Sequence, residues 1–253
     1  MEALGLTTCF YNFMHKYLDD PSYTRPSPST STSPPKGPYT STLTILHHIR
    51  SDDRFSDIPS TPGAIGLQDL FTSHEGAILE HWNSWALPDP DAQFKDAAAT
   101  PVALLVGTAY PSEEEKEYDF FLVHLLTTSH AIRVLLPLLP AQHHIPLLRQ
   151  WWLFVIAVYI AQGRPDVNVG RFVDREVEGK GWEDVEREAR EGRWRFDAHF
   201  VKALRSMRVA AGTWEGDEEM GVFYLRAAVR MSEEFRGWGG FGALGEEEGG
   251  GGH

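Results

Sequence analysis

The sequence is poor in cysteine and in basic residues. Cys9 is its single cysteine, so neither an internal disulfide nor a cysteine-based zinc site can form, and we expect a reducing, cytoplasmic location. The 36 acidic residues outnumber the 23 basic ones and give a formal net charge of −13. Proteins that bind nucleic acids or anionic membranes present basic clusters. We therefore expect no nucleic acid and no membrane among the partners.

Long apolar runs and the common catalytic motifs are also missing. The most apolar run covers residues 151–161, well short of the roughly 20 residues that cross a bilayer, and it predicts a buried core helix. The sequence has no glycine-rich dinucleotide fingerprint, no phosphate-binding P-loop, no H-E-x-x-H motif and no G-x-S-x-G elbow. A nucleotide site of the Rossmann type is therefore unsupported.

What the sequence does contain is material for a helical core. Hydrophobic residues make up 42% of the chain, with 14 Phe and 8 Trp. Ser112 and Glu115 have the spacing of a capping box, Pro137 disfavours continuation of a helix, and Gly163 suits a left-handed C-cap. Apolar periodicity and such signals predict helices over residues 2–18, 42–53, 67–85, 94–106, 113–136, 145–162, 174–195, 198–211 and 218–235. No alternating strand pattern stands out.

These elements predict an all-α protein with a single multi-helix domain. Residues 1–20 form its N-terminal helix, and residues 41–236 form the main helical part. Residues 21–40 are rich in Pro, Ser and Thr and are expected to be a disordered linker, because they cannot bury enough apolar surface. Residues 237–253 are glycine-rich and acidic, and we expect a flexible tail.

Two pairs of histidines lie on predicted helices, His74 with His81 and His124 with His130. His74 and His81 are seven residues apart, about 10 Å along a helix, and a solvated face is the better interpretation. His124 and His130 lie in a nearly apolar helix and need partners if buried. They are six residues apart and point about 120° from each other, so one helix could not make them chelate one metal. Either a core histidine satisfied by a neighbouring helix or a site residue fits each.

A second polar face lies on the helix expected at 198–211. His199 and Lys202 are three residues apart and share a face that Arg205 continues. That face could be ordinary surface, or it could line a polar cavity. In the second case a buried lysine would have a depressed pKa, and its neutral amine could take up carbon dioxide to give a carbamate that binds metal like a carboxylate.

Three sequence blocks carry a family resemblance: YDFFLVHLLTTSHAIRVLLPLLP at 118–140, HHIPLLRQWWLFVIAVYIAQGRPDV at 143–167 and DAHFVKALRSM at 197–207. They resemble the C-terminal blocks of the questin oxidase-like family, which includes HypA-like proteins and the Baeyer–Villiger-type oxidases of fungal aflatoxin pathways. Residues 1–22 resemble the segment that follows the central histidine-rich block of the family. The similarity covers most of the chain outside 23–40 and the tail.

The resemblance implies an oxidoreductase, an oxygenase that acts on polycyclic aromatic polyketides such as anthraquinones in secondary metabolism. It implies NADPH as electron donor for some members and, for at least one relative, non-haem iron held by histidines and a carboxylated lysine. His124, His130 and His199 are then candidates for a metal ligand or for a substrate-facing acid or base. We take His124, His199 and Lys202 as the candidate metal residues. His130 and Arg133 are the candidate catalytic residues, with Arg133 placed to hold a phenolate or carboxylate.

The chain also departs from the family. Family members are longer and carry N-terminal histidine blocks of the N-H-x-x-H and H-P-x-x-H kinds, which are absent here. We therefore expect a truncated or inactive copy, with self-association through apolar surface that the absent part would cover. The alternative is a non-catalytic helical pseudoenzyme or partner module. A weaker third hypothesis is a helical protein that binds apolar aromatic molecules in its Trp- and Phe-rich core without chemistry.

Overall fold

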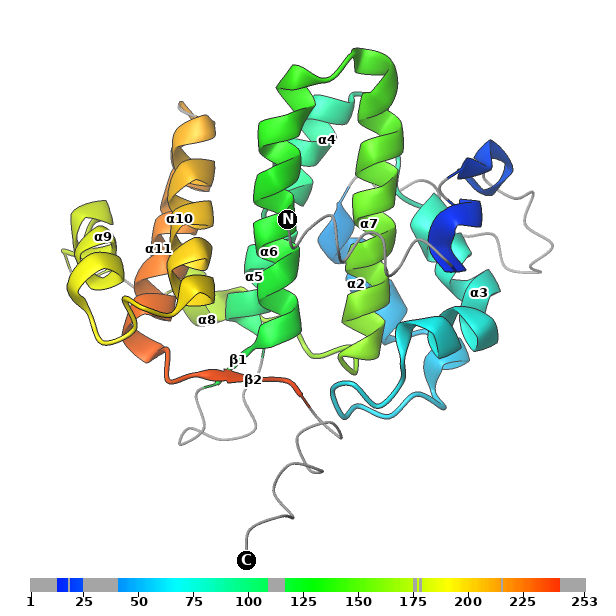
Figure 1. The fold of residues 1–253 in the computed structure, drawn as a ribbon, viewed down its shortest axis with the longest axis horizontal. Coiled ribbons are helices and arrows are strands. Elements are labelled where there is room, and N and C mark those ends of the chain that lie inside the picture. Colours follow the sequence, from blue (N-terminus) through cyan, green and yellow to red (C-terminus); the bar gives the residue numbers. More distant parts are fainter. Residues whose placement is uncertain are drawn as a thin grey trace, which may run out of the picture.

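The computed structural model describes residues 13–17, 19–24, 41–108, 117–174, 177, 179–214 and 216–241. These residues are 71% helical with almost no strand, which confirms the predicted all-α class (Figure 1). Most of the predicted N-terminal helix, residues 25–40 of the predicted linker and residues 242–253 of the predicted tail lie outside the described residues.

An antiparallel helical hairpin forms the centre of the molecule. Its two arms are α6 (Phe120–Leu135) and α7 (His144–Ala161), joined by the short 3-10 turns η3 (Leu136–Leu138) and η4 (Ala141–His143). The hairpin stands upright in Figure 1, with its turn at the top. The amino-terminal elements that pack around it are η1 (Pro21–Thr24), α2 (Thr42–Arg50), η2 (Asp53–Phe55), α3 (Leu67–Asn83), α4 (Pro90–Ala97) and α5 (Thr100–Gly107). Of these, α2, α3 and α4 contact α7, while α5 contacts α6.

The carboxyl-terminal helices cover the other side of α6. They are α8 (Gly170–Val173), α9 (Trp182–Glu191), α10 (Ala198–Thr213) and α11 (Glu218–Glu234). Helix α10 packs on α6, α11 packs on α10, and α9 contacts both α10 and α11 (Figure 1). Because α10 packs on α6, side chains of α6 contact residues that lie about 75 positions later in the sequence.

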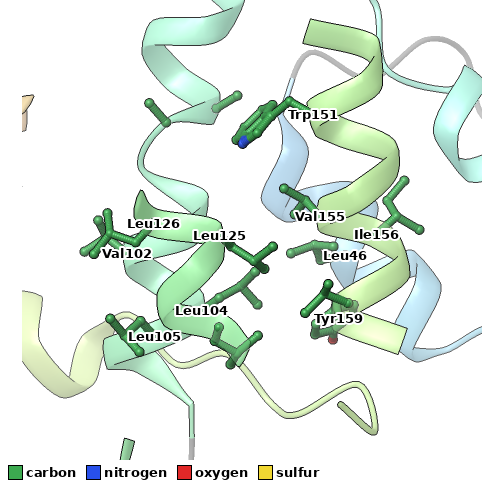
Figure 2. Packing of buried hydrophobic residues seen from close by; sticks show 14 of the residues in the cluster. Leu46, Val102, Leu104, Leu105, Leu125, Leu126, Trp151, Val155, Ile156 and Tyr159 are labelled. Carbon is green, nitrogen blue, oxygen red and sulfur yellow. The ribbon is translucent and has the colours of Figure 1, made fainter. Parts of the chain in front are cut away.

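The hydrophobic core lies between the hairpin and its neighbours. Figure 2 shows Leu104 and Leu125 facing Leu46, Val155 and Tyr159 across the space between α6 and α7. All five side chains are buried. The predicted burial of the apolar run at 151–161 is confirmed, because every residue of this run except Phe154 and Ala161 is buried.

The hairpin arms are longer than that run. By length and composition alone, Phe120–Leu138 and Ala141–Ala161 are apolar enough to span a membrane, and the core helices of a globular domain meet the same test. The apolar run at 151–161 is therefore only the carboxyl-terminal part of a longer helix, α7.

Helix α6 begins later than predicted. It starts at Phe120, where the Asp119 carboxylate accepts hydrogen bonds from the backbone N–H groups of Phe121 and Leu122 at 2.8 and 2.9 Å. The predicted start at 113 is wrong, and the expected capping box of Ser112 and Glu115 lies outside the described residues. Asp119 satisfies two backbone N–H groups that have no partner inside the helix, and this cap determines where the helix begins. Apolar periodicity alone does not locate the first residue.

Other boundaries follow the same physical rules. The helix expected at 94–106 is two helices, α4 and α5, with a break at Ala98 and Ala99. The predicted cap at Asp197 is confirmed, since its carboxylate accepts from the N–H groups of His199 and Phe200. Gly163 has φ of 78° just after α7, which confirms the predicted left-handed position.

A two-stranded parallel pair lies beneath the base of α6 (Figure 1). Strand β1 (Tyr118–Asp119) pairs with β2 (Trp238–Gly239), two residues each. Strands this short carry no alternating pattern, so sequence inspection could not find them. The described residues run through Phe241, so β2 and the two residues after it belong to the described structure.

Candidate functional site

The structure brings together two of the three residues predicted as metal ligands. His124 on α6 and His199 on α10 have their ring centroids 5.1 Å apart. The ring of Phe120, one turn before His124, lies against both, at 4.8 Å from His124 and 4.7 Å from His199. Both imidazoles are half-buried. Two imidazoles from different helices at this separation can share one ligand, proton or metal ion between them.

The hydrogen bonding of His124 fixes its tautomer. Its Nδ1 lies 2.7 Å from the carbonyl oxygen of Phe120, and a carbonyl can only accept. Nδ1 therefore carries the hydrogen, and in the neutral ring Nε2 keeps its lone pair. This is the arrangement that histidine uses when Nε2 binds a metal or takes up a proton.

Aromatic rings from the carboxyl-terminal segment complete the surroundings of the pair. Trp238 lies 6.2 Å from His199 and 5.9 Å from Phe120, and Phe241 lies 5.5 Å from Phe120. The indole N–H of Trp238 donates to Asp197 at 2.9 Å, the same carboxylate that caps α10. We refer to Phe120, His124, His199, Trp238 and Phe241 as the aromatic site.

Asp119 lies at the edge of the aromatic site with an unusual proton affinity. Burial raises the pKa of its carboxyl to about 6, against hydrogen bonds from Leu122, Phe121 and Gln162 that lower it. Gly240, with φ of 84°, places its backbone directly against the second carboxylate oxygen, where a Cβ would overlap it. A buried carboxyl that titrates near neutrality beside aromatic rings is a candidate acid or base.

The predicted catalytic residues form a separate cluster farther along α6. Along the helix axis His130 lies about 9 Å and Arg133 about 13 Å beyond His124, because each residue adds about 1.5 Å. Nη2 of Arg133 donates to Nδ1 of His130 and lies 3.4 Å from the carbonyl oxygen of Ser206. Burial lowers the pKa of His130, and the positive charges of Arg133 and Arg205 lower it further. His130 is therefore neutral near pH 7, with its remaining hydrogen on Nε2.

Arg133 is buried without a carboxylate partner among the residues that the structure describes. Its guanidinium lies 5.7 Å from the ring of Trp214, and burial lowers its pKa. Its Nε and the hydroxyl of buried Tyr224 both lack a hydrogen-bond partner. This cluster is positively charged and could hold an anionic oxygen, but the structure keeps it apart from the aromatic site.

Lys202 lies one turn after His199 on α10 and is exposed, which favours the ordinary surface over the polar cavity of the two alternatives. The face that carries it turns toward solvent, because the buried side of α10 consists of residues such as Phe200, Ala203 and Met207. Within the described residues no group of three His, Cys, Asp or Glu side chains is placed to hold a metal. The aromatic site supplies two imidazoles, and a carboxylated Lys202 is the third donor that the predicted iron site would need.

His74 and His81 are not on a solvated face, which corrects the sequence interpretation. Nε2 of His81 donates to the carboxylate of Asp52 at 2.7 Å, and each side chain is only 12% exposed. His74 lies 3.5 Å from Asp57 and is 9% exposed. Burial lowers the pKa of His81 despite its acidic partner. Helix α3 packs this face against the η2 turn, which helical spacing alone could not reveal.

Sequence reasoning missed Asp119, Phe120, Trp238 and Phe241. Asp119 had a signal, since an aspartate directly before an apolar helix is a preferred N-cap. Trp238 and Phe241 had none, because they stand in a glycine-rich segment that composition assigns to a tail.

Comparison with known proteins identifies the family of the chain. The sequence profile of the family described as questin oxidase-like matches residues 1–207, most of the chain. The chain belongs to the questin oxidase-like family. The match includes His124, His130, Arg133, His199 and Lys202 but stops before Trp238 and Phe241. No curated protein matches the chain. Membership of this family indicates an oxidase.

Proposed function

We propose that this questin oxidase-like protein oxidises a polycyclic aromatic polyketide, such as an anthraquinone, in secondary metabolism, and that the aromatic site is where the substrate binds. The observation that carries the proposal is the His124–His199 pair, 5.1 Å apart and lined by Phe120. Family membership supports the oxidase chemistry. Aromatic walls support a flat aromatic substrate, because ring pairs prefer tilted or edge-to-face contacts such as those found here.

The residues of the site have defined tasks in this proposal. Nε2 of His124 takes the proton from a phenolic hydroxyl, since Nδ1 is held by the Phe120 carbonyl. Removing this proton raises the electron density of the ring and makes it easier to oxidise. Asp119, whose pKa is about 6, can store and return a proton near neutral pH at the edge of the same site. Trp238, anchored on Asp197, shields the site from water.

Iron and NADPH remain part of the proposal. His124 and His199 would provide two imidazoles, and a carboxylated Lys202 would complete the ligand set of many non-haem iron oxygenases only by turning back from solvent toward the pair. Iron held there would supply the binding and activation of dioxygen. We assign no residue to NADPH.

The proposal is tested by oxygen consumption with a dihydroxyanthraquinone as substrate. His124→Ala and His199→Ala should each lower kcat/KM by about 100-fold or more, the usual cost of losing a general base or ligand. His143→Ala is the matched control, because His143 is exposed in η4, and it should leave the rate unchanged. Unchanged melting temperatures would show that the variants remain folded.

The same preparation separates the cofactor question from the enzyme question. Iron content measured by mass spectrometry should fall in Lys202→Ala if the carboxylated lysine is a ligand. Turnover by iron-free protein would contradict the iron assignment and leave the oxidase. Wild-type protein that binds the anthraquinone without consuming oxygen would contradict the oxidase and support the non-catalytic binding module.

A further inference from the structure

A pocket of about 370 Å³ lies on the opposite side of α10 from α6, between α9 and the end of α11. Its size falls in the range of small-molecule sites. Trp194 and Phe235 are among its lining residues, and the partly exposed ring of Trp194 packs edge to face on the ring of Phe235 at 5.0 Å. Phe235 is buried and also contacts Trp238 at 4.8 Å, so one ring separates this pocket from the aromatic site.

The pocket is locally positive on a strongly acidic chain. Four cationic and three acidic side chains line it, a net charge of +1 on a chain whose net charge is −13. Two of the cations are already paired, since Lys180 bonds Glu233 and Arg187 bonds Asp184. The two arginines that remain, Arg193 and Arg236, have no carboxylate within ion-pair distance among the described residues.

The surroundings of these two arginines leave their donors open to a ligand. The guanidinium of Arg193 lies 4.9 Å over the ring of Trp194, and that of Arg236 donates only to the carbonyl oxygens of Glu233 and Phe235, at 3.0 and 2.9 Å. Both side chains are exposed, so neither is needed to stabilise the core. Guanidinium groups recognise carboxylates and phosphates through paired N–H donors.

Two acceptors complete the polar lining. Glu188 on α9 has no cationic partner among the described residues, and its carboxylate can accept a hydrogen bond from a ligand hydroxyl. Ser232 donates its hydroxyl hydrogen to the carbonyl oxygen of Val229 at 2.8 Å, so its oxygen is left to accept. An aromatic ring, two arginines and two acceptors in one pocket favour a ligand that is flat, carries a negative charge at one end and bears a hydroxyl group.

We propose that this pocket binds a hydroxylated aromatic carboxylate, with the carboxylate on Arg193 and Arg236 and the ring against Trp194. A phosphate offers the arginines the same charge, but it has no ring to place on the aromatic wall. A nucleotide supplies both, and the experiment therefore includes one. Binding at this pocket does not depend on turnover at the aromatic site, so it can be measured whether or not the chain is an oxidase.

The experiment is calorimetric titration of the full chain with a hydroxynaphthoate whose hydroxyl and carboxylate are adjacent. Arg193→Gln and Arg236→Gln should each weaken binding by about tenfold, as expected for the loss of one charge-assisted pair. Arg190→Gln is the matched control, an exposed arginine on α9 outside the pocket, and should bind like the wild type. Glu188→Gln should reduce the preference for hydroxynaphthoate over naphthoate.

Three results would overturn the assignment. The first is naphthol binding as tightly as hydroxynaphthoate, which would remove the role of the carboxylate. The second is binding that the double variant of Arg193 and Arg236 leaves unchanged. The third is NADP⁺ that binds more tightly than hydroxynaphthoate and depends on the same two arginines, which would make the occupant a nucleotide phosphate.

Discussion

Asp119 joins three parts of the structure through one side chain. It belongs to β1, it caps α6 through Oδ1, and it faces the backbone of Gly240 and the amide of Gln162. Burial raises its pKa to about 6, although three N–H donors favour the charged form. The carboxyl is thus more easily protonated in the folded chain than in the unfolded one, where its pKa is near 3.8.

Stability should depend on pH through this residue, and the sign follows from linkage. The folded state binds the proton more tightly, so the contribution of Asp119 is fully present below pH 3.8 and is lost as the pH rises through about 6. Asp119→Asn removes the titration and keeps the cap. We expect the melting temperature of the variant to rise relative to wild type between pH 4 and pH 7, measured by circular dichroism. Parallel profiles would contradict the raised pKa.

His124 and His130 show how neighbours set opposite roles for the same residue type on one helix. The Phe120 carbonyl places the hydrogen of His124 on Nδ1 and leaves Nε2 as an acceptor. Arg133 donates to Nδ1 of His130, so in the neutral ring Nε2 is a donor. His124 is thus suited to take a proton or bind a metal, and His130 to donate a hydrogen bond to an anionic oxygen held by Arg133.

At the scale of elements, the end of α7 depends on Gly163. Its φ of 78° is the left-handed conformation that favours glycine, and a Cβ there would overlap the carbonyl oxygen of Ser60. Gly163→Ala should therefore lower the free energy of unfolding by about 1–3 kcal/mol, the cost of a strained backbone position, measured by urea denaturation. Gly221→Ala is the control, because Gly221 lies within α11 with open space around it. It should raise stability by about 0.5–1 kcal/mol. Equal effects of the two substitutions would contradict the role of Gly163.

Elements could be predicted from the sequence where a local rule decides them. Gly163 and Asp197 were predicted because the chemistry of a helix end acts within a few residues. The start of α6 was not, because the residues before Asp119 are as suited to a helix by composition as those after it. The break between α4 and α5 at Ala98 and Ala99 precedes Pro101, which lies in the first turn of α5 and has no N–H to continue α4, a local signal that the apolar periodicity over 94–106 obscured.

Of the aromatic site, only His124 and His199 could be predicted from the sequence, and not their grouping. Helical spacing predicted that His124 and His130 point apart along α6, and the structure gives the two rings different partners. It could not show that His124 meets His199, because that contact depends on how α10 packs on α6. It also could not show that Trp238 lies beside His199, because the β1–β2 pairing that positions Trp238 joins segments over 100 residues apart.

At the scale of the whole molecule, the turn of the central hairpin carries several of the exposed large hydrophobic side chains among the described residues. Val134, Leu135, Leu138 and Ile145 are 49%, 43%, 74% and 46% exposed, and all lie where α6 passes into α7, at the top of Figure 1. We refer to these four residues as the hairpin tip. Contiguous apolar surface of this kind marks an interaction site. The net charge of −13 opposes association of two copies, and salt screens that repulsion.

We therefore expect concentration-dependent self-association through the hairpin tip, stronger at high salt than at low salt. The double substitution Leu138→Glu and Ile145→Glu should leave a monomer under both conditions, measured by sedimentation velocity over a range of protein concentrations. Both side chains are exposed, so the charges enter water and not the core.

Phe196→Glu is the control, since Phe196 is 85% exposed but lies in the turn after α9, and this variant should associate like the wild type. A wild type that stays monomeric at high salt, or a double variant that associates as strongly, would show that the hairpin tip does not bind a second copy. Because salt strengthens apolar contacts and weakens ionic ones, the direction of the salt effect also separates this interface from one built on the charged surface of α9.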